Sequence, residues 1–226
     1  MERKNAMFMK KKSVLIIGIG RFGRYLAHKF SELGNEVMIV DRSEEKLNDL
    51  VSIVTSAQIG DCTNLEVLRS LGVSNFDICF VCIGSNFQSS IEITYQLKEL
   101  GAQYVIAKVN REIHEKFLLR NGADEVVYPE KESANKTALR LSANHVFDYI
   151  ELTSEYSIIE IPPLSLWIGK TIANVDVRSR YNINILAIKI NNKVSPLPDA
   201  DYIFKNEEHL IIAGNRADLM CLMKKL

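Results

Sequence analysis

Short apolar runs alternate with helix-like segments along the first half of the chain, and this rhythm constrains its fold more than any other feature. The apolar runs predict strands at 14–17, 36–40, 53–59, 77–83, 104–109 and 125–128. The segments between them have the periodicity or end signals of helices, at 21–33, 43–50, 63–71, 87–100 and 111–120. Continuously apolar strands that alternate with helices indicate a parallel sheet covered on both faces. The predicted fold class is α/β, a Rossmann-type doubly wound parallel sheet.

After the sixth predicted strand the pattern changes, and one long helix is predicted at 131–147. The tail is richer in strands, which are predicted at 156–161, 183–190 and 209–213. Asn215 is placed to cap a last helix at 217–223. We therefore predict a Rossmann-type domain at 13–148, which includes the long helix, and a small α+β domain at 149–226.

The first predicted strand runs directly into the glycine-rich loop Gly18-Ile-Gly-Arg-Phe-Gly23, which opens a helix. In this strand–loop–helix context the motif has a mechanism. Gly18 permits a tight turn, Gly20 lets the backbone approach phosphates, and Gly23 lets the helix pack closely on the sheet. The helix N-terminus presents N–H groups to an anion. The loop therefore predicts a bound nucleotide.

Charged residues stand where they would meet the parts of such a nucleotide. Asp41 ends the second predicted strand, where a carboxylate accepts hydrogen bonds from ribose hydroxyls. A 2′-phosphate would be disfavoured by this charge, although the neighbouring Arg42 weakens that argument. Arg21 lies inside the loop and has a guanidinium that can bind a terminal phosphate. Lys108, at the end of the fifth predicted strand, is placed to face the phosphates.

Two further turns are expected at the same edge of the sheet. Asp61 and Cys62 follow the third predicted strand, and Ile83 and Gly84 end the fourth. Asp61 has two open interpretations, as a ligand contact or as a cap of the helix that follows.

The composition excludes several other classes of protein. Lys plus Arg and Asp plus Glu both number 28, so the formal net charge is zero, which argues against broad binding to a nucleic-acid backbone. No apolar run reaches the length of about 18 residues that a membrane span requires. The basic start at 1–12 lacks the apolar core of a secretory signal, and we expect a solvated tail.

Cys79 and Cys82 form a C-x-x-C pattern, which invites a redox or zinc interpretation. They lie in an apolar segment predicted as a strand, and a separation of three residues puts their side chains on opposite faces. We expect buried, reduced thiols, which also fit a cytosolic location.

An NAD(H)-dependent oxidoreductase or a redox-sensing Rossmann protein is the competing class of function, and few residues of the sequence support catalysis. A dehydrogenase needs a second site that positions a substrate and a proton donor. The histidines stand in no catalytic pattern; they are His28, His114, His145 and His209. Tyr104 and Lys108 are too far apart along a strand to share a proton, and Tyr25 and Lys29 lie on the glycine-loop helix. No zinc or nucleophile-elbow pattern is present, so we predict a protein that is not an enzyme. A transcriptional repressor with a Rossmann-type sensor is a third class, but such proteins usually carry a helix-turn-helix, and no segment has that pattern.

A series of short motifs in the first domain is followed in order by a second series in the tail. The first series is Gly20-Arg-Phe-Gly23, Asp41, Gly60-Asp61, Gly84-Ser-Asn86, Gly122-Ala-Asp124 and Pro129-Glu-Lys131. The second comprises 176–188, Ser195-Pro-Leu-Pro198 and 209–214. Together they resemble the RCK regulatory subunits of Ktr- and Trk-type potassium uptake systems, over nearly the whole chain after residue 12.

The resemblance implies a cytoplasmic regulator that forms homodimers, assembles into an octameric ring and docks on the inner face of a potassium-translocating membrane subunit. It implies ATP or ADP as ligand, and NAD(H) in some members, with nucleotide exchange changing the ring. It assigns the ribose to Asp41, the phosphates to Arg21 and Lys108, and a divalent cation, Mg or Ca, to Glu130. The complete expected nucleotide set is Gly18, Gly20, Arg21, Phe22, Gly23, Asp41, Arg42, Asp61, Cys62, Ile83, Gly84, Lys108 and Glu130.

In several relatives the C-terminal domain pair binds cyclic di-AMP, which the resemblance extends to this chain. The matching positions are Ile172, Ala173, Asp176, Arg178, Asn184 and Pro196. One departure from the family pattern is Arg24, which stands after the last loop glycine where a small residue is common. We expect its charge to lie near the phosphates, and this leaves the choice between ATP, ADP and NAD(H) open.

Overall fold

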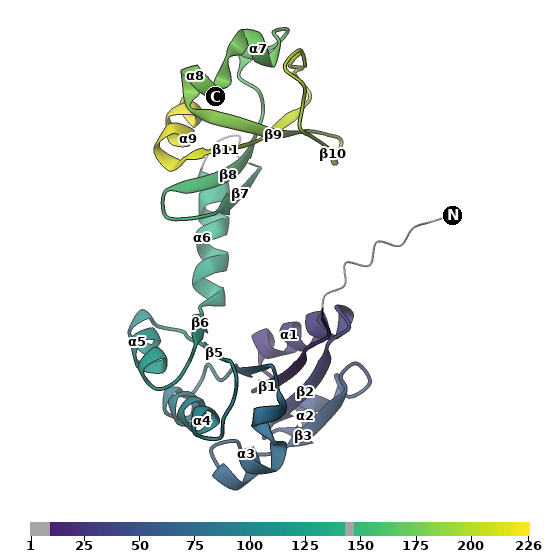
Figure 1. Ribbon diagram of the computed structural model, residues 1–226, viewed down its shortest axis with the longest axis vertical. Helices are drawn as coiled ribbons and strands as arrows, with labels where there is room; N and C mark the ends of the chain where they lie inside the picture. The colour runs from purple at the N-terminus through teal and green to yellow at the C-terminus, as the bar shows by residue number, and fades with distance from the viewer. Residues whose placement is uncertain (1–9, 143–146) are drawn as a thin grey trace, which may run out of the picture. The chain divides into compact units, whose positions relative to one another are not determined.

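The computed structural model describes residues 10–142 and 147–226 and divides into two compact units, with the division after Glu130 (Figure 1). Most of the basic start predicted to be a solvated tail lies outside the described residues. The sequence-based domain boundary at residue 148, which groups the long helix with the first domain, stays a prediction.

The first unit is built on a six-stranded parallel sheet. Its strands are β1 (Ser13–Ile17), β2 (Glu36–Asp41), β3 (Ser56–Ile59), β4 (Ile78–Val81), β5 (Val105–Lys108) and β6 (Glu125–Val127). They lie in the order β3-β2-β1-β4-β5-β6, and all neighbours pair in parallel. The chain reverses its direction of travel across the sheet between β1 and β4. The predicted doubly wound fold is confirmed.

Alternate residues of the strands bury apolar side chains on opposite faces of this sheet. In β1, Leu15 and Ile17 belong to one apolar cluster, whereas Val14 and Ile16 belong to another. Cys79 packs in the first cluster and Cys82 in the second. Burial raises the pKa of each of these thiols to about 12. The expectation of buried free thiols on opposite faces is therefore confirmed.

The sheet is flanked by α1 (Arg21–Glu32), α2 (Glu44–Asn48), α3 (Leu65–Leu71), α4 (Phe87–Glu99) and α5 (Glu112–Arg120). Asn64 and Asn86 cap α3 and α4 through their side-chain oxygens. The third strand is shorter than predicted, because the N–H groups of Ile53 and Val54 bond back to Leu50 and continue the turn after α2. Among the described residues, no helix has the length and apolar character needed to cross a lipid bilayer.

The second unit contains α6 (Pro129–Ser142), most of whose residues belong to it, and an antiparallel sheet. The strands of this sheet are β7 (Asp148–Glu151), β8 (Tyr156–Ile161), β9 (Ile183–Ile190), β10 (Lys193–Pro196) and β11 (His209–Asn215). Their order is β10-β9-β11-β8-β7. The helix does not reach Phe147 as predicted, because the N–H of Phe147 donates to Glu160 and extends the β7–β8 pairing. Residues 143–146 lie outside the described ones.

One face of this second sheet buries an apolar core around Trp167 and Phe204. The short helices α7 (Ile172–Val175), α8 (Val177–Tyr181) and α9 (Arg216–Met223) add apolar residues to that core. Asn215 caps α9 by accepting from the N–H of Ala217, as predicted. The small α+β domain is confirmed, although β7, β10, α7 and α8 were not predicted.

Candidate nucleotide-binding site

A cavity of about 620 Å³ lies where strands β1 to β5 end at the carboxyl edge of the parallel sheet. It is centred on the switch between β1 and β4, where ligands bind in doubly wound sheets. The residues of the expected nucleotide set that line it are Gly18, Gly20, Arg21, Phe22, Asp41, Arg42, Asp61, Cys62, Ile83, Gly84, Lys108 and Glu130. Gly23 is the remaining member of that set, and it lies buried behind the loop.

The glycines of the loop play different structural parts. Gly18 has a φ of +92°, in the region that favours glycine. A Cβ on Gly23 would lie 2.3 Å from the carbonyl oxygen of Gly18, so the helix can approach the loop only without a side chain there. A Cβ on Gly20 would meet no atom within 4 Å. A side chain on Gly20 would therefore extend into the cavity and not into the protein core.

Among the described residues of its first turn, no acidic side chain neutralises the partial positive charge at the N-terminus of α1, which begins at this loop. Gly20 stands at the cap position and offers no side-chain acceptor, and the first turn holds no acidic residue. The first N–H groups of a helix have no partner within the helix and carry a partial positive charge. An anionic group fits this end of the cavity.

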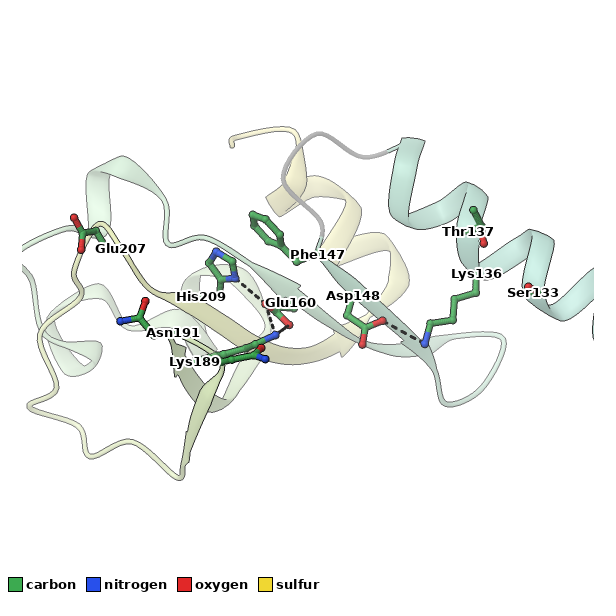
Figure 2. A pocket seen from close by; sticks show the side chains of 11 residues that line it. Ser133, Lys136, Thr137, Phe147, Asp148, Glu160, Lys189, Asn191, Glu207 and His209 are labelled. Carbon is green, nitrogen blue, oxygen red and sulfur yellow. Dashed lines mark hydrogen bonds and ion pairs between the residues drawn. The ribbon is translucent and has the colours of Figure 1, made fainter. Parts of the chain in front are cut away.

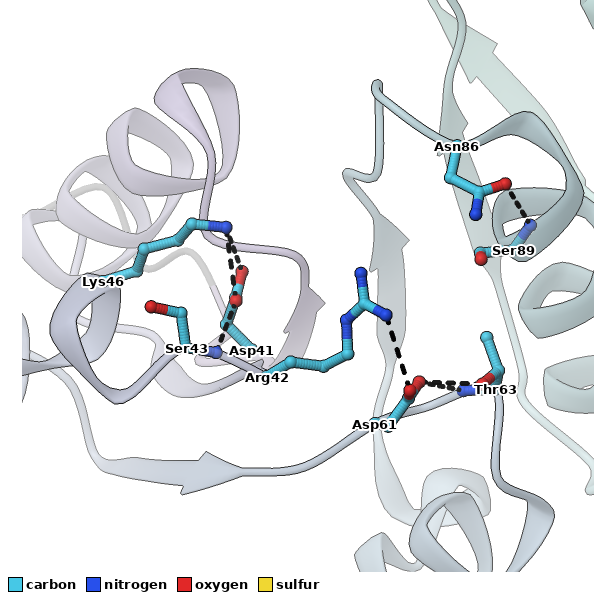
Figure 3. A network of polar contacts seen from close by, with 8 residues as sticks. All are labelled: Asp41, Arg42, Ser43, Lys46, Asp61, Thr63, Asn86 and Ser89. Carbon is cyan, nitrogen blue, oxygen red and sulfur yellow. Dashed lines mark hydrogen bonds and ion pairs between the residues drawn. The ribbon is translucent and has the colours of Figure 1, made fainter.

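Asp41 is held in place by the backbone around it. Its two carboxylate oxygens accept from the N–H of Ile19 at 2.7 Å and from the N–H of Ser43 at 2.9 Å. Lys46 lies 3.3 Å away from the same carboxylate (Figure 3). Burial raises the pKa of Asp41, but these donors outweigh burial and hold it below its ordinary value. The carboxylate is ionised at neutral pH and oriented at the cavity wall.

The turn between β2 and α2 depends on Asp41. Ser43 occupies the N-cap position of α2, but its side chain makes no capping bond. The turn is organised instead by Asp41, which accepts the Ser43 N–H. The residue expected to bind ribose therefore also shapes the loop that follows it.

Asp61 and Arg42 face each other across the cavity wall. Arg42 lies 3.6 Å from the Asp61 carboxylate, which also accepts from the hydroxyl and the N–H of Thr63 (Figure 3). The bonds from Thr63 lower the pKa of Asp61. Asp61 is not the cap of α3, because Asn64 fills that role. Of the two interpretations left open by the sequence, the capping role is thus excluded.

Lys108 and Glu130 close the other end of the cavity. The mostly buried Lys108 donates to the Glu130 carboxylate at 2.6 Å. This bond lowers the pKa of Glu130, and the charge of Arg21 acts in the same direction. Three charged groups are thus gathered where phosphates are expected. Among the described residues, no group of three or more His, Cys, Asp or Glu side chains is placed to hold a metal ion.

Several cavity residues were missed from the sequence. The polar ones are Ser43, Lys46, Thr63, Ser85, Ser89 and Asn110. Asn110 donates to the Gly84 carbonyl at 2.6 Å and so joins the ends of two strands. Lys46 could have been suspected, because it lies in the short helix directly after Asp41. Asn110 had no such signal beyond its place just after β5.

The expectation for Arg24 is wrong. Its guanidinium does not turn toward the phosphates and does not line the cavity. One nitrogen donates to the Asp49 carboxylate and the other to the backbone carbonyl of Lys46, both at 3.1 Å. Arg24 thereby ties α1 to α2, and the extra charge is neutralised by Asp49.

The residues expected to bind cyclic di-AMP are distributed over four elements of the second unit. Ile172 and Ala173 lie in α7, Asp176 and Arg178 at the start of α8, Asn184 in β9 and Pro196 in β10. Asp176 has a φ of +51° and accepts from the Ser179 hydroxyl. All six except Ile172 are exposed. Their role as a ligand site stays a prediction.

A second cavity, of about 750 Å³, lies in the second unit and is lined by other residues (Figure 2). Its wall includes Glu160, which accepts from Lys189 at 2.8 and 3.0 Å. Nδ1 of His209 lies 2.7 Å from Glu160, and the His209 ring stacks on Phe147. Partial burial raises the pKa of Glu160, but the Lys189 and His209 bonds outweigh it and hold the pKa low.

Among the described residues, neither tyrosine–lysine pair weighed for an oxidoreductase is joined by a hydrogen bond, and Lys29 donates to Glu32 instead. Tyr104 donates to Glu125, whereas Lys108 donates to Glu130. His114 is stacked on Phe87, and His209 belongs to the Glu160 cluster. His145 lies outside the described residues.

Comparison with known families places both units. The TrkA-N domain matches residues 14–129, and the TrkA-C domain matches residues 156–226. The chain is 41% identical to the Ktr system potassium uptake protein C of Bacillus subtilis, over 96% of this chain and 98% of that protein. It is 37% identical to the Ktr system potassium uptake protein A of the same organism, over 93% and 95%. These names describe potassium uptake proteins, which agrees with the prediction that the chain is not an enzyme.

Solved structures share the fold at lower identity. The GsuK channel superposes with a TM-score of 0.68 at 20% identity, over 95% of this chain and 39% of that one. A GsuK channel bound to NAD gives a TM-score of 0.66 with the same coverage. The GsuK RCK domain superposes with a TM-score of 0.66 at 20% identity, over 95% of this chain and 47% of that one, which supports the RCK-type fold for both units.

Proposed function

The chain belongs to the family of potassium uptake proteins that join a TrkA-N domain to a TrkA-C domain, and from this premise we propose that it is a nucleotide-sensing regulatory subunit. The observation that supports the proposal is the cavity at the switch point of the parallel sheet. It combines an open glycine loop, an ionised carboxylate at one end and a cationic end opposite. These are the complementary groups for the ribose and phosphates of a nucleotide.

ATP and ADP are the proposed ligands, and their difference provides the switch. A ligand shifts a conformational equilibrium only by its difference in affinity for the two states. The third phosphate of ATP adds charge that Arg21 and Lys108 are placed to bind. Lys108 is engaged with Glu130 in the structure. We infer that a terminal phosphate competes for Lys108 and releases Glu130, which is then available to a divalent cation such as Mg or Ca.

The proposed setting is a ring of homodimers, eight subunits in all, on the inner face of the cell membrane. There it would gate a separate potassium-translocating subunit, and nucleotide exchange would change the ring. The curated relatives are named as parts of the Ktr system, which supports a membrane partner of this kind. Cyclic di-AMP bound by the residues between Ile172 and Pro196 is proposed as a second input.

Isothermal titration of the full chain with ATP, ADP, NADH, NADP and cyclic di-AMP tests the proposal. We expect ATP and ADP to bind and the Asp41→Ala variant to lose at least tenfold in affinity for both, since it removes a charged hydrogen-bond acceptor. Glu45→Ala removes an exposed carboxylate from α2 outside the cavity and serves as the control. A cyclic di-AMP site in the second unit would survive Asp41→Ala.

Other results would contradict parts of the proposal. Binding of NADH alone would replace the ATP and ADP switch with a dinucleotide-sensing function. Absence of binding by every nucleotide would contradict a nucleotide sensor altogether. Solution scattering that gives the same particle shape with ATP and with ADP would contradict the proposed switch while leaving binding intact.

A further inference from the structure

The carboxylate of Asp41 retains acceptor capacity in the cavity. A carboxylate has about four acceptor positions, two on each oxygen. The N–H of Ile19 uses one position on one oxygen, and the N–H of Ser43 uses one on the other. Each oxygen therefore has one acceptor position that no backbone N–H uses.

Lys46 lies across these remaining positions without filling them firmly. Its ammonium is 3.3 Å and 3.4 Å from the two oxygens, longer than the range of about 2.7–2.9 Å for strong charged hydrogen bonds. Its side chain is 50% exposed and lines the cavity. Because the lysine of this pair is half exposed and its bonds are long, solvent screens the interaction and it contributes little to stability. The fold therefore has little need of this pair, whereas a ligand in the cavity would meet it directly.

Lys46 and Arg42 are both near Asp41, but only Lys46 is directed to it. The Arg42 side chain extends away from Asp41 and toward Asp61 (Figure 3). The backbone of Lys46 is held by Arg24, whose guanidinium donates to the Lys46 carbonyl. Since Arg24 lies in the helix that starts at the glycine loop, this bond ties the backbone of Lys46 to that helix, while its side chain is free to reach a ligand.

The two side chains complement the chemistry of a ribose hydroxyl. A hydroxyl both donates and accepts, whereas ionised Asp41 can only accept and Lys46 can only donate. We propose that Lys46 recognises the 2′-hydroxyl of the bound ribose by donating a hydrogen bond to its oxygen, while Asp41 accepts a hydrogen bond from the same hydroxyl. The site thereby selects ribonucleotides over 2′-deoxyribonucleotides. This proposal rests on the nucleotide-sensing function and adds a specificity determinant to it.

Titration of the full chain and of Lys46→Met with ADP and 2′-deoxy-ADP tests this role. The wild-type chain is expected to prefer ADP. Lys46→Met is expected to lose about tenfold in affinity for ADP and to change little for 2′-deoxy-ADP, because only ADP has the hydroxyl that Lys46 binds. Lys29→Met removes an exposed lysine that pairs with Glu32 on α1, and it should change neither affinity. An unchanged unfolding temperature shows that each variant is folded.

The alternatives give different results. Equal weakening of ADP and 2′-deoxy-ADP by Lys46→Met would overturn the proposal, since Lys46 would then be a general attractant for phosphate. Tighter binding of both would also overturn it, because Lys46 would then be a competitor for Asp41. In both cases the wild-type chain still binds ADP and the proposed function stands. If the wild-type chain binds no adenine nucleotide, the proposed function and this proposal are both overturned.

Discussion

Each unit of the molecule holds a buried carboxylate beside a lysine, and the two are built differently. The side chains of Asp41 and Glu160 are 9% and 8% exposed, and the pKa of each is below its ordinary value. Asp41 takes its short bonds from backbone N–H groups, and its lysine is loosely placed. Glu160 takes its short bonds from the side chains of Lys189 and His209.

The difference shows what makes a buried carboxylate available to a ligand. Backbone donors orient Asp41 at the end of a strand and leave acceptor positions toward a cavity. Glu160 lies within β8 and faces Lys189 from β9 and His209 from β11, so its acceptor positions are already used by side chains of the sheet. We infer that Asp41 serves binding and Glu160 serves the stability of the second sheet. The predictions below test this contrast.

The largest effect is expected at the loop that supports Asp41. Gly23→Ala places a Cβ against the Gly18 carbonyl, and relief of this clash should cost about 3 kcal/mol of unfolding free energy. Gly20→Ala should leave stability nearly unchanged, because its Cβ meets no protein atom, but should weaken nucleotide binding. Urea unfolding and ADP titration measure the two effects. Equal stability loss in both variants would contradict the assigned roles.

A smaller effect is expected from Glu160→Gln. Loss of the bonds that need its charge should destabilise the second unit by about 2 kcal/mol, a value limited by the partial exposure of Lys189 and His209. Trp167 is the single tryptophan of the chain and is buried in that unit, so its fluorescence reports the unfolding. Asp41→Asn is the matched variant, which should spare the Trp167 transition and weaken ADP binding. If Asp41→Asn destabilised the Trp167 transition while Glu160→Gln weakened ADP binding, the roles assigned to the two carboxylates would be wrong.

Lowering the pH should reduce the stability that both carboxylates, Asp41 and Glu160, contribute to the folded state. A pKa that is lower in the folded state contributes stability that is complete above the unfolded-state pKa, about 4, and is lost as the pH falls through the folded value. The Trp167 transition of the wild-type chain should therefore weaken between about pH 5 and pH 3. Glu160→Gln should show a shallower decline over this range. An identical decline would mean that Glu160 does not set this dependence.

The smallest expected effect is a difference in thiol reactivity between the two units. Cys62, Cys79 and Cys82 lie in the first unit, and burial raises the pKa of each to about 12. Cys221 in the second unit is exposed. At pH 8 a thiol reagent should modify Cys221 quickly and the other three only on unfolding. Cys221→Ser should remove the fast reaction, and a remaining fast phase would show that a first-unit thiol is accessible.

The first unit was easier to predict from the sequence than the second. Its central strands β1, β4 and β5 are apolar on both faces, and the glycine loop marks the ligand-binding edge, so the order of elements and the position of Asp41 could be inferred. Strand β10 was missed because it is short and exposed, with polar Asn191 and Asn192 before it at positive φ. The tail therefore shows weaker periodicity than its fold would suggest.

Side-chain partners were the least predictable part. Arg24 was expected near the phosphates, but its choice of Asp49 depends on how α1 and α2 pack, which no local pattern reveals. The same holds for Lys46, whose backbone is placed by Arg24. The pairing of Lys108 with Glu130 joins residues far apart in sequence and was likewise not foreseen. Sequence patterns thus located the groups of the site but not their present partners.

Strand β10 has a consequence for how the protein behaves at high concentration. It forms one edge of the second sheet, and such edges can recruit strands from other molecules and start aggregation. The N–H of Leu197 bonds inward to Leu186, so the alternation of an antiparallel strand turns the nitrogen of Pro196 outward. Proline has no hydrogen on that nitrogen, and Lys193 begins the strand with a charge. Pro196 therefore cannot donate a backbone hydrogen bond to a strand of another molecule, and it protects this sheet edge from disordered aggregation.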